Sequence, residues 1–327
     1  MTSLRRYTDD DRDRWDRFVS ESKNGTFLFH RGYMEYHRDR FTDHSLLFFD
    51  TKERLIALLP ANESTDAEGR KTLHSHAGLT YGGLVLSTHT RASEVLDIFA
   101  SLNLYALDNG FSRVVYKPVP TIYHQMPSEE DRYALFRLGA AKTVCNLSCC
   151  VELEEDYDFI ERRRLRGMNK ALKLSYLIEE SPLDSVWAII TDNLRNRYGA
   201  TPVHTLPEME RLQQLFPEQI RCYAAKDDEG KAQAVAVIYV TPKVVHVQYG
   251  HATPQGKHDG ALDLLYLNLI SNYCKYRYFD FGTSNEQGGR VLNENLIAQK
   301  EGFGGRGIVY ETYEWNPQPD NENKQAI

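Results

Sequence analysis

Two residues near the C-terminal end, Asp280 and Lys300, have side chains suited to acid–base and charge-stabilising chemistry. Asp280 lies in the apolar, strand-like run YFDFG, and a carboxylate at a strand end can accept a proton or orient an amine. Lys300 precedes the block Gly302-Phe303-Gly304-Gly305, and a cation there can stabilise negative charge as it develops on a reacting oxygen. The alternative for Lys300 is a structural role at a helix C-terminus, where positive charge is favoured.

A glycine-containing turn, Lys257 to Ala261, separates the strand-like run KVVHVQYGHA from an apolar helix over 260–273. A strand that leads through a loop into a helix N-terminus presents unpaired backbone N–H groups to an anion. The turn therefore predicts an anion site at Lys257, Gly260 and Ala261. Glycine turns are common, so the turn alone is a weak signal.

Two polar clusters are candidates for binding a substrate. Loops at the carboxyl ends of strands are the usual place for ligand contacts in α/β sheets. The first cluster follows the strand-like run RVVYKPVP and the second lies in RNRYGATPVH; their members are Lys117, Tyr123 and His124, and Arg195, Tyr198 and His204.

A basic helix is predicted within 159–173, where six positive charges fall in twelve residues: Arg162, Arg163, Arg164, Arg166, Lys170 and Lys173. These side chains could meet the phosphates of a nucleotide-activated substrate or of transfer RNA. They could equally form a solvated helix face opposite the acidic segment EEDYD, and both interpretations stay open.

Helices and strands alternate along the chain, which indicates an α/β fold with mixed sheets. An internal repeat is visible in the order of these elements. Arg113 and Arg277 lie 164 residues apart, and the pairs Tyr81-Gly82 and Tyr249-Gly250 lie 168 apart, each within the same succession of helix and strand. We therefore predict two copies of one α/β unit, with domains at 1–152 and 153–315 and a disordered tail at 316–327.

Composition excludes several classes of protein. The chain has 327 residues, 39 basic and 46 acidic side chains and 41% apolar residues, which fits a globular protein of two domains. A net charge of −7 argues against a protein that coats nucleic acid, and DNA is not an expected partner. No run approaches the ~18 apolar residues of a membrane span. The first residues, MTSLRRYTDDDRDRW, do not resemble a signal peptide, so we expect a cytoplasmic protein. The five cysteines form no CxxC pair and predict buried free thiols, with no metal site.

Several segments together resemble the Fem family, bacterial peptidyltransferases built from two acetyltransferase-like (GNAT) domains in tandem. Asp280-Phe281-Gly282 resembles the family's DFGG-like corner, and Lys300 with Phe303-Gly304-Gly305 resembles its closing block. RRRLRGMNKALKLSYLIEES is similar to the helix and strand that open the family's second domain. Segments such as GTFLFHRGYMEYH and GLTYGGLVLS resemble acyltransferases of cell-envelope polysaccharide pathways.

The resemblance implies two tandem GNAT-like domains, with the donor held by the second. It implies attack of an amine on an acyl carbonyl, with Lys300, Asp280 and Tyr249 as catalytic candidates. The turn at Lys257, Gly260 and Ala261 would then hold the pyrophosphate of acetyl-coenzyme A or another acyl-coenzyme A as co-substrate. The acceptor would be a small molecule, a nucleotide-linked amino sugar or similar cell-envelope precursor.

Two alternatives remain open. One is a Fem-type transferase that uses aminoacyl-tRNA on a peptidoglycan precursor, which would need a basic surface from Arg162 to Lys173 towards Lys300. The other is a non-catalytic GNAT-fold binding protein. Leu262 and Gln299 depart from the family pattern at donor positions, where a small residue and a phenylalanine are expected.

Overall fold

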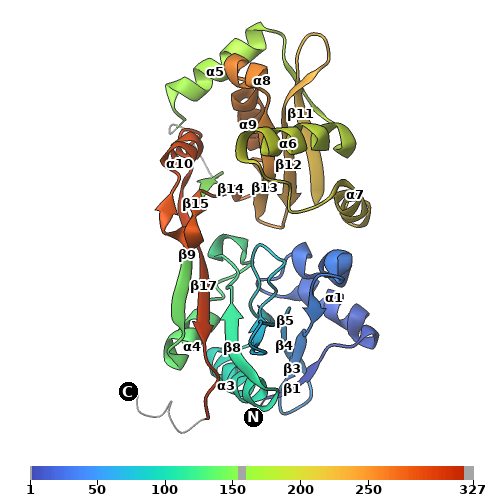
Figure 1. Ribbon diagram of the computed structural model, residues 1–327, viewed down its shortest axis with the longest axis vertical. Helices are drawn as coiled ribbons and strands as arrows, with labels where there is room; N and C mark the ends of the chain where they lie inside the picture. Colours follow the sequence, from blue (N-terminus) through green and yellow to red (C-terminus); the bar gives the residue numbers. More distant parts are fainter. Residues whose placement is uncertain (1, 154–159, 320–327) are drawn as a thin grey trace. The chain divides into compact units, whose positions relative to one another are not determined.

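A computed structural model describes residues 2–153 and 160–319 of the chain (Figure 1). The chain divides into two compact units. Unit 1 comprises Met1–Asn146, Gly288–Arg290 and Val309–Ile327, and unit 2 comprises Leu147–Gln287 and Val291–Ile308. The sequence predicted two uninterrupted domains, 1–152 and 153–315. The units differ from these because β9 (Ala141–Glu152) runs from unit 1 into unit 2, and β17 (Arg306–Trp315) runs back.

Unit 1 contains a four-stranded sheet and a group of five paired strands. The four-stranded sheet has the order β1 (Ser3–Arg6), β3 (Leu46–Phe49), β4 (Leu55–Leu59) and β7 (Val85–Leu86). The second group has the order β17, β8 (Phe111–Tyr116), β6 (Lys71–His74), β5 (Asn62–Thr65) and β2 (Thr42–Asp43). Its helices are α1 (Arg12–Glu21), α2 (Arg31–Met34), α3 (Ala92–Asp108) and α4 (Glu130–Leu138). Trp315 of β17 packs into the core beside Phe99, with ring centroids 6.1 Å apart.

Unit 2 is built on the strands β10 (Leu177–Glu180), β11 (Ile220–Lys226), β12 (Ala232–Val240), β13 (Val244–Ala252), β14 (Tyr278–Thr283) and β9, in that order. The helices are α5 (Arg162–Lys173), α6 (Leu183–Tyr198), α7 (Leu206–Leu215), α8 (Pro254–Asp259), α9 (Ala261–Asn272) and α10 (Glu294–Glu301). A short hairpin joins β15 (Asn285–Glu286) and β16 (Val291–Leu292). The apolar side of α9 packs with α5 and alternate residues of the strands, including Val245, Val247 and Phe279.

The predicted repeat of elements is present along the chain. The first succession is α3, β8, α4, β9 and the second is α9, β14, α10, β17; the last strand of each continues from one unit into the other. In each, the strand after the long helix joins its neighbour in parallel, β8 beside β6 and β14 beside β13, while the surrounding pairs are antiparallel. The prediction of mixed sheets and two related α/β units is therefore confirmed.

Some local predictions were wrong. The sequence pattern over 29–38 predicts one helix, but the segment is broken into α2 between two 3₁₀ turns, Phe27–Phe29 and Glu35–His37. The run LTYGGLVLS predicts a strand-rich segment, but its strand is limited to β7, because its glycines adopt turn geometry and Gly83 has a positive φ. All five cysteines are free, but Cys145 and Cys274 are exposed rather than buried.

Two expectations concern segments at the margins of the described residues. The acidic segment EEDYD, next to the predicted boundary between the two domains, lies at 154–158, outside the described residues. For the tail, residues 316–319 are described, and Asn103 Nδ2 donates a hydrogen bond to the Gln318 carbonyl over 2.6 Å. The rest of the tail lies outside the described residues. Across the described ranges, no helix combines the length and apolar character that crossing a bilayer requires.

Candidate active site where β13 and β14 diverge

Strands β13 and β14 pair in parallel over three residues each and then separate. Their last shared register pair is His246 with Asp280. Beyond it, β13 continues beside β12 as far as Ala252, while β14 turns at Gly282, whose φ of +75° is a left-handed conformation that glycine adopts without strain. Since side chains alternate along a strand and Val245 and Phe279 face the α9 core, His246 and Asp280 share the opposite face.

Asp280 is fully buried and accepts several hydrogen bonds. Its Oδ2 lies 2.8 Å from His246 Nδ1, and its Oδ1 accepts from Ser148 Oγ at 2.7 Å and from the Gly282 N–H at 3.0 Å. These donors fix the carboxylate in one orientation. A buried carboxylate held in this way orients the groups that it contacts.

His246 was not identified from the sequence. Because its Nδ1 faces a carboxylate, Nδ1 is the donating nitrogen, and Nε2 of the neutral ring carries a lone pair. Nε2 has no hydrogen-bond partner among the described residues, and the side chain keeps 11% of its surface exposed. A carbon at the ring's edge, Cε1, lies 3.3 Å from where a Cβ on Gly282 would be, so the ring borders the turn of β14. A histidine oriented by a buried aspartate can act as a general base.

Lys300 lies in the last turn of α10 and is buried. Its ammonium donates to the carbonyls of Gly282 and Thr283, each at 2.8 Å, and to Ser284 Oγ at 2.9 Å. Burial lowers the pKa of Lys300 to about 8. The three contacts fasten the turn after β14, and they differ from the helix-capping alternative because none goes to a carbonyl of α10. Asp280 and Lys300 are thus brought together through Gly282.

Tyr249, the third predicted catalytic residue, is paired with a residue predicted to bind substrate. Its hydroxyl lies 2.7 Å from His204 Nδ1, and Trp187 of α6 packs edge-on against its ring at 5.1 Å. Burial raises the pKa of Tyr249 to about 12, so the phenol is a neutral hydrogen-bonding group. The structure brings Tyr249 and His204 together and separately unites Asp280 with Lys300.

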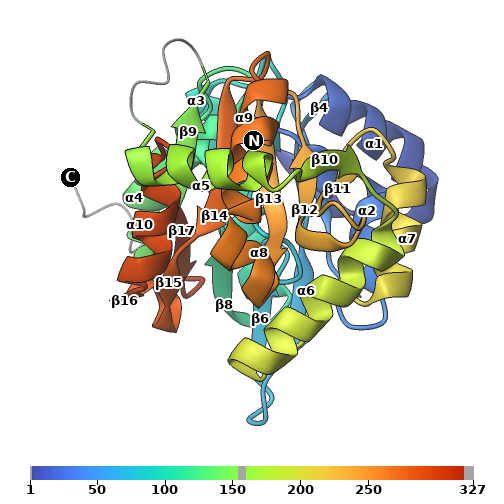
Figure 2. The same cartoon turned by 90° about the horizontal axis from the view of Figure 1, so that it is seen from above.

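The turn predicted to bind pyrophosphate lies beneath α5 (Figure 2). Gly260 joins α8 to α9 with a φ of +81°, and it approaches α5 so closely that a Cβ on it would overlap the Gly167 carbonyl. Gly260 and Ala261 are buried, whereas Lys257 is exposed on α8. The glycine here serves close helix packing, which a sequence pattern cannot distinguish from phosphate binding.

Two carboxylates also occupy the surroundings of this turn. Asp259 is buried and accepts from Tyr176 at 3.0 Å and from Gln255 at 2.7 Å; these and neighbouring donors lower its pKa to about 2. Asp263, in the first turn of α9, pairs with Arg164 of α5 at 2.9 Å. An anion could reach the amides at 260 and 261 only if α5 moved and if the repulsion from Asp259 were overcome. Leu262, half-buried, packs against the same core.

The candidate residues of unit 1 are mostly engaged within the protein. Tyr123 is buried with its hydroxyl 3.0 Å from that of Tyr310, and His124 is buried with Nε2 3.0 Å from the Val119 carbonyl. Burial lowers the pKa of His124 to about 4 and that of Lys117 to about 8. Lys117 directs its ammonium to the Leu79 carbonyl. In unit 2, Arg195 is exposed on α6, and the side chain of Tyr198 lies outside the described residues.

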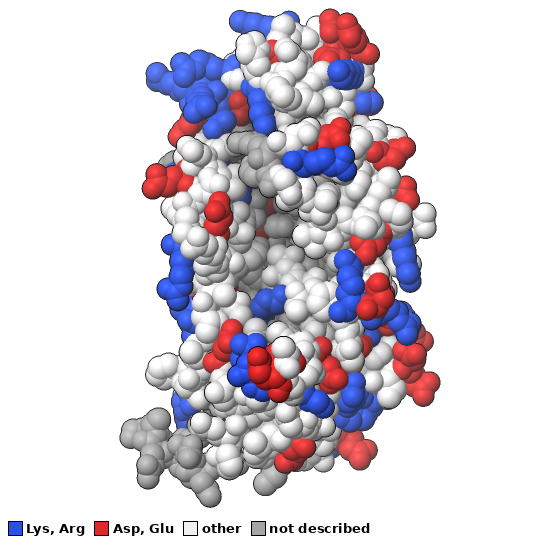
Figure 3. Space-filling view, viewed as in Figure 1, with Lys and Arg blue, Asp and Glu red and all other residues white. Residues whose placement is uncertain are grey.

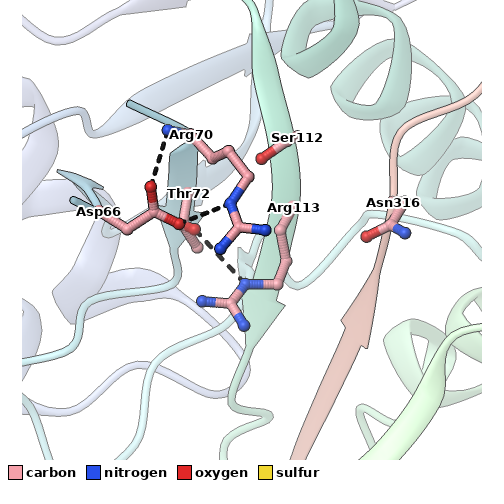
Figure 4. A pocket seen from close by; sticks show the side chains of 6 residues that line it. All are labelled: Asp66, Arg70, Thr72, Ser112, Arg113 and Asn316. Atoms are coloured by element: carbon pink, nitrogen blue, oxygen red, sulfur yellow. Dashed lines mark hydrogen bonds and ion pairs between the residues drawn. The ribbon is translucent and has the colours of Figure 1, made fainter. Parts of the chain in front are cut away.

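A shallow pocket of unit 1 contains none of the predicted site residues (Figure 4). Two arginines line it: Arg70, in the turn before β6, and Arg113, in β8. Arg70 pairs with Asp66 at 2.7 Å, and Arg113 lies 3.5 Å from Glu314. Because acidic partners already neutralise both cations, this pocket offers no net charge with which to hold an anion.

Comparison with known proteins agrees with this description. Residues 161–287 match the family model of the acetyltransferase (GNAT) domain. No curated protein matches the chain in sequence. Among solved structures, FemX is similar over 96% of this chain and 97% of its own, with a TM-score of 0.70 at 11% identity.

Two further structures share the fold. The C-terminal domain of a putative lysylphosphatidylglycerol synthetase from Agrobacterium fabrum has a TM-score of 0.59 at 13% identity, covering 94% of this chain and 92% of that one. A tandem GNAT protein from the clavulanic acid biosynthesis pathway has a TM-score of 0.53 at 10% identity, covering 98% and 100%. These identities establish the fold alone.

Residues 161–287 therefore form an acyltransferase domain of the GNAT class, and the whole chain has the fold of two GNAT-like domains in tandem. The predicted resemblance to the Fem-like tandem GNAT family is confirmed at the level of the fold.

Proposed function

We propose that this acyltransferase transfers an acyl or aminoacyl group to an amine of a cell-envelope precursor, with His246 as the general base. The observation that carries the proposal is the His246–Asp280 pair at the point where β13 and β14 separate. In that position the ring has one nitrogen fixed by a buried carboxylate and the other without a partner among the described residues.

The reaction follows from this geometry. The acceptor amine attacks the carbonyl carbon of the donor while His246 Nε2 takes a proton from the nitrogen. Asp280 stabilises the imidazolium that forms. As the tetrahedral intermediate collapses, the new C–N bond remains, the carbon–sulfur or carbon–oxygen bond of the donor breaks, and the imidazolium returns its proton to the leaving group. Lys300 holds the turn of β14 against which the histidine ring lies.

The surroundings of the turn at 257–261 bear on which acyl donor the protein uses. Acyl-coenzyme A would need the turn at Lys257, Gly260 and Ala261, where α5 and Asp259 stand in the way of a pyrophosphate. This observation favours the second donor, an aminoacyl ester carried by transfer RNA. The basic surface expected for that donor does not extend to Lys300, since Lys300 is buried, so both donors belong in the first assay.

The acceptor rests on the family resemblance. The expected class is a nucleotide-linked amino sugar or a nucleotide-linked muropeptide, in the cytoplasm, and the acceptor-binding residues predicted from the sequence remain Lys117, Tyr123, His124, Arg195, Tyr198 and His204. Of these, Arg195 is the better candidate because it is exposed on α6, whereas Tyr123 and His124 are buried with internal partners and Lys117 donates to the Leu79 carbonyl.

The experiment is a transfer assay with two donors and two acceptors, read by the mass of the acceptor. Acetyl-coenzyme A and a mixture of aminoacyl-tRNAs are each combined with a nucleotide-linked amino sugar and a nucleotide-linked muropeptide. We expect an amide product from at least one combination, reduced by about 100-fold or more in His246→Gln. The exposed His89 supplies the matched control, His89→Gln, which keeps full activity.

Absence of product in every combination, together with absence of a thermal shift with either donor, contradicts the proposal. That result favours the remaining alternative, a GNAT-fold protein that binds the acceptor without catalysis.

A further inference from the structure

The outer face of α5 combines cationic and apolar side chains. With about 100° between successive helical residues, Arg162, Arg166 and Lys173 fall on one line along the helix. Arg163 and Lys170 lie on one flank of that line, and Leu165 and Leu172 lie on the other. The opposite face of α5 is the packed one, where Arg164 and Ala171 are buried.

The cations on this face are available to a partner. Arg162, Arg163, Arg166 and Lys173 form no ion pair with any other residue in the described ranges. Lys170 differs, because it donates to the His258 carbonyl and lies 3.5 Å from Asp259. Figure 3 shows Lys and Arg side chains gathered over α5, on a protein whose net charge is −7.

Exposed leucines line one flank of the face and its C-terminal end. The exposed fractions are 37% for Leu165, 51% for Leu172 and 43% for Leu174. In β10, which follows, the two glutamates are each paired with a basic residue outside α5: Glu179 with Lys226 and Glu180 with Arg221. We call the set of Arg162, Arg163, Leu165, Arg166, Leu172, Lys173 and Leu174 the α5 face.

The buried side of α5 explains why this face stays exposed and rigid. Arg164 is held at 2.9 Å by Asp263 and lies with its guanidinium carbon 5.0 Å from the centre of the Phe303 ring. Gly167 allows α5 to approach Gly260 closely. The helix is therefore fixed to α9 by its inner side, and the outer side is presented as a preformed surface.

We propose that the α5 face docks the protein on a membrane surface that contains anionic lipid. Arginines and a lysine that form no ion pair within the described ranges match the charge of the headgroups, and leucines beside them can enter the boundary between headgroups and acyl chains. A face for single-stranded or looped RNA would be expected to carry aromatic side chains on which bases stack, and the α5 face has none. This inference does not use the chemistry proposed at His246, but it assigns to lipid the basic surface that an aminoacyl-tRNA donor would otherwise use.

The test is flotation of the full-length protein with vesicles. Two vesicle types are used, phosphatidylcholine alone and phosphatidylcholine mixed with phosphatidylglycerol. We expect flotation with the anionic vesicles alone. The double variant with Arg162→Glu and Arg166→Glu should have a partition coefficient between vesicle and water that is lower by more than about tenfold, since each basic residue near an anionic surface contributes to the binding.

The matched control changes the same amount of charge elsewhere. Lys52→Glu with Lys231→Glu replaces two exposed lysines outside α5 and leaves flotation unchanged. For the apolar component, Leu172→Ser with Leu174→Ser lowers the partition coefficient severalfold, whereas Leu215→Ser, at an equally exposed leucine on α7, does not. All variants are at exposed positions, and a melting curve for each verifies that it is folded.

Three results would overturn the proposal. The first is that the wild-type protein does not float with anionic vesicles. The second is that the variant with Arg162→Glu and Arg166→Glu floats as well as wild type. Alternatively, the leucine variant binds with unchanged affinity, which means that the face attracts any polyanion by charge alone. If the protein binds transfer RNA in a manner that depends on Arg162 and Arg166 and does not float, the α5 face is an RNA surface and not a membrane surface.

Discussion

Nδ1 of His246 and Oδ2 of Asp280 lie 2.8 Å apart at the last register pair that β13 and β14 share. The pairing places a histidine against a fully buried carboxylate at the one point in this parallel pair where the strands begin to diverge. A third strand supports the arrangement, because Ser148 of β9 donates to the same carboxylate. The site is thus assembled from three strands that are distant in the sequence.

Replacing Lys300 by methionine is expected to destabilise the protein. Two effects oppose each other. Removing a buried ammonium relieves a desolvation cost of about 3 kcal/mol, given the lowered pKa, but three acceptors lose their donor, at about 1–3 kcal/mol each. Over three acceptors the loss is about 3–9 kcal/mol, which outweighs the relief, and we expect a net decrease of up to about 6 kcal/mol in the free energy of unfolding, measured with urea. Lys52→Met, at an exposed lysine, is the control. A Lys300→Met protein as stable as wild type would contradict the assigned contacts.

Gly260→Ala is expected to be strongly destabilising because α5 packs on Gly260. Gly260 and Gly230 have similar positive φ angles, +81° and +78°, so both substitutions strain the backbone by about 1 kcal/mol. A Cβ at Gly230 meets open space, whereas at Gly260 it would overlap the backbone of Gly167. We expect Gly260→Ala to cost at least about 2 kcal/mol more than Gly230→Ala in urea unfolding. Equal costs would mean that α5 does not cover the turn in solution.

Stability should decrease between pH 6.5 and pH 4 in part because of His124. Burial lowers the pKa of His124 from 6.5 to about 4, so within this window the unfolded chain binds a proton that the folded protein does not. The free energy of unfolding therefore falls as the pH is lowered through the window, by as much as about 3 kcal/mol from this group.

The measurement for His124 is urea unfolding across the window for wild type and His124→Gln. The variant should show a flatter dependence on pH. His89→Gln, at an exposed histidine, should retain the wild-type slope. If His124→Gln keeps the wild-type slope as well, the folded histidine is not held neutral.

Alkylation of the folded protein should label Cys145 and Cys274 and spare the other thiols. Cys145 and Cys274 are exposed, while Cys149, Cys150 and Cys222 are buried. Burial also raises the pKa of Cys149 and of Cys222 to about 12, which suppresses the reactive thiolate. Mass spectrometry after brief iodoacetamide treatment should find two labelled cysteines, and five after unfolding. Early labelling of Cys149 would contradict its burial.

Local sequence patterns predicted most of the elements that build the site. The apolar pattern of 260–273 predicted α9, and the strand-like run YFDFG predicted β14, which holds Asp280. These features depend on neighbours along the chain, which is why a single sequence contains them.

The remaining features depend on contacts between distant segments. His246 sits among valines in a strand, and nothing local marks it; its role requires the parallel register that places it beside Asp280. The packing of Gly167 on Gly260 is likewise invisible in a turn that resembles an anion site. The return of Trp315 to the core of unit 1 depends on the pairing of β17 with β8.

The most direct test of His246 as the general base is the kcat/KM of His246→Ala in the amide-forming assay, measured with and without added imidazole. We predict a loss of about 100-fold or more, since a general base contributes that much, and partial recovery when imidazole enters the space left by the side chain. The control His89→Ala, at an exposed histidine, should have the wild-type kcat/KM both with and without imidazole. A His246→Ala enzyme with wild-type kcat/KM would show that the proton is taken elsewhere and would contradict the account.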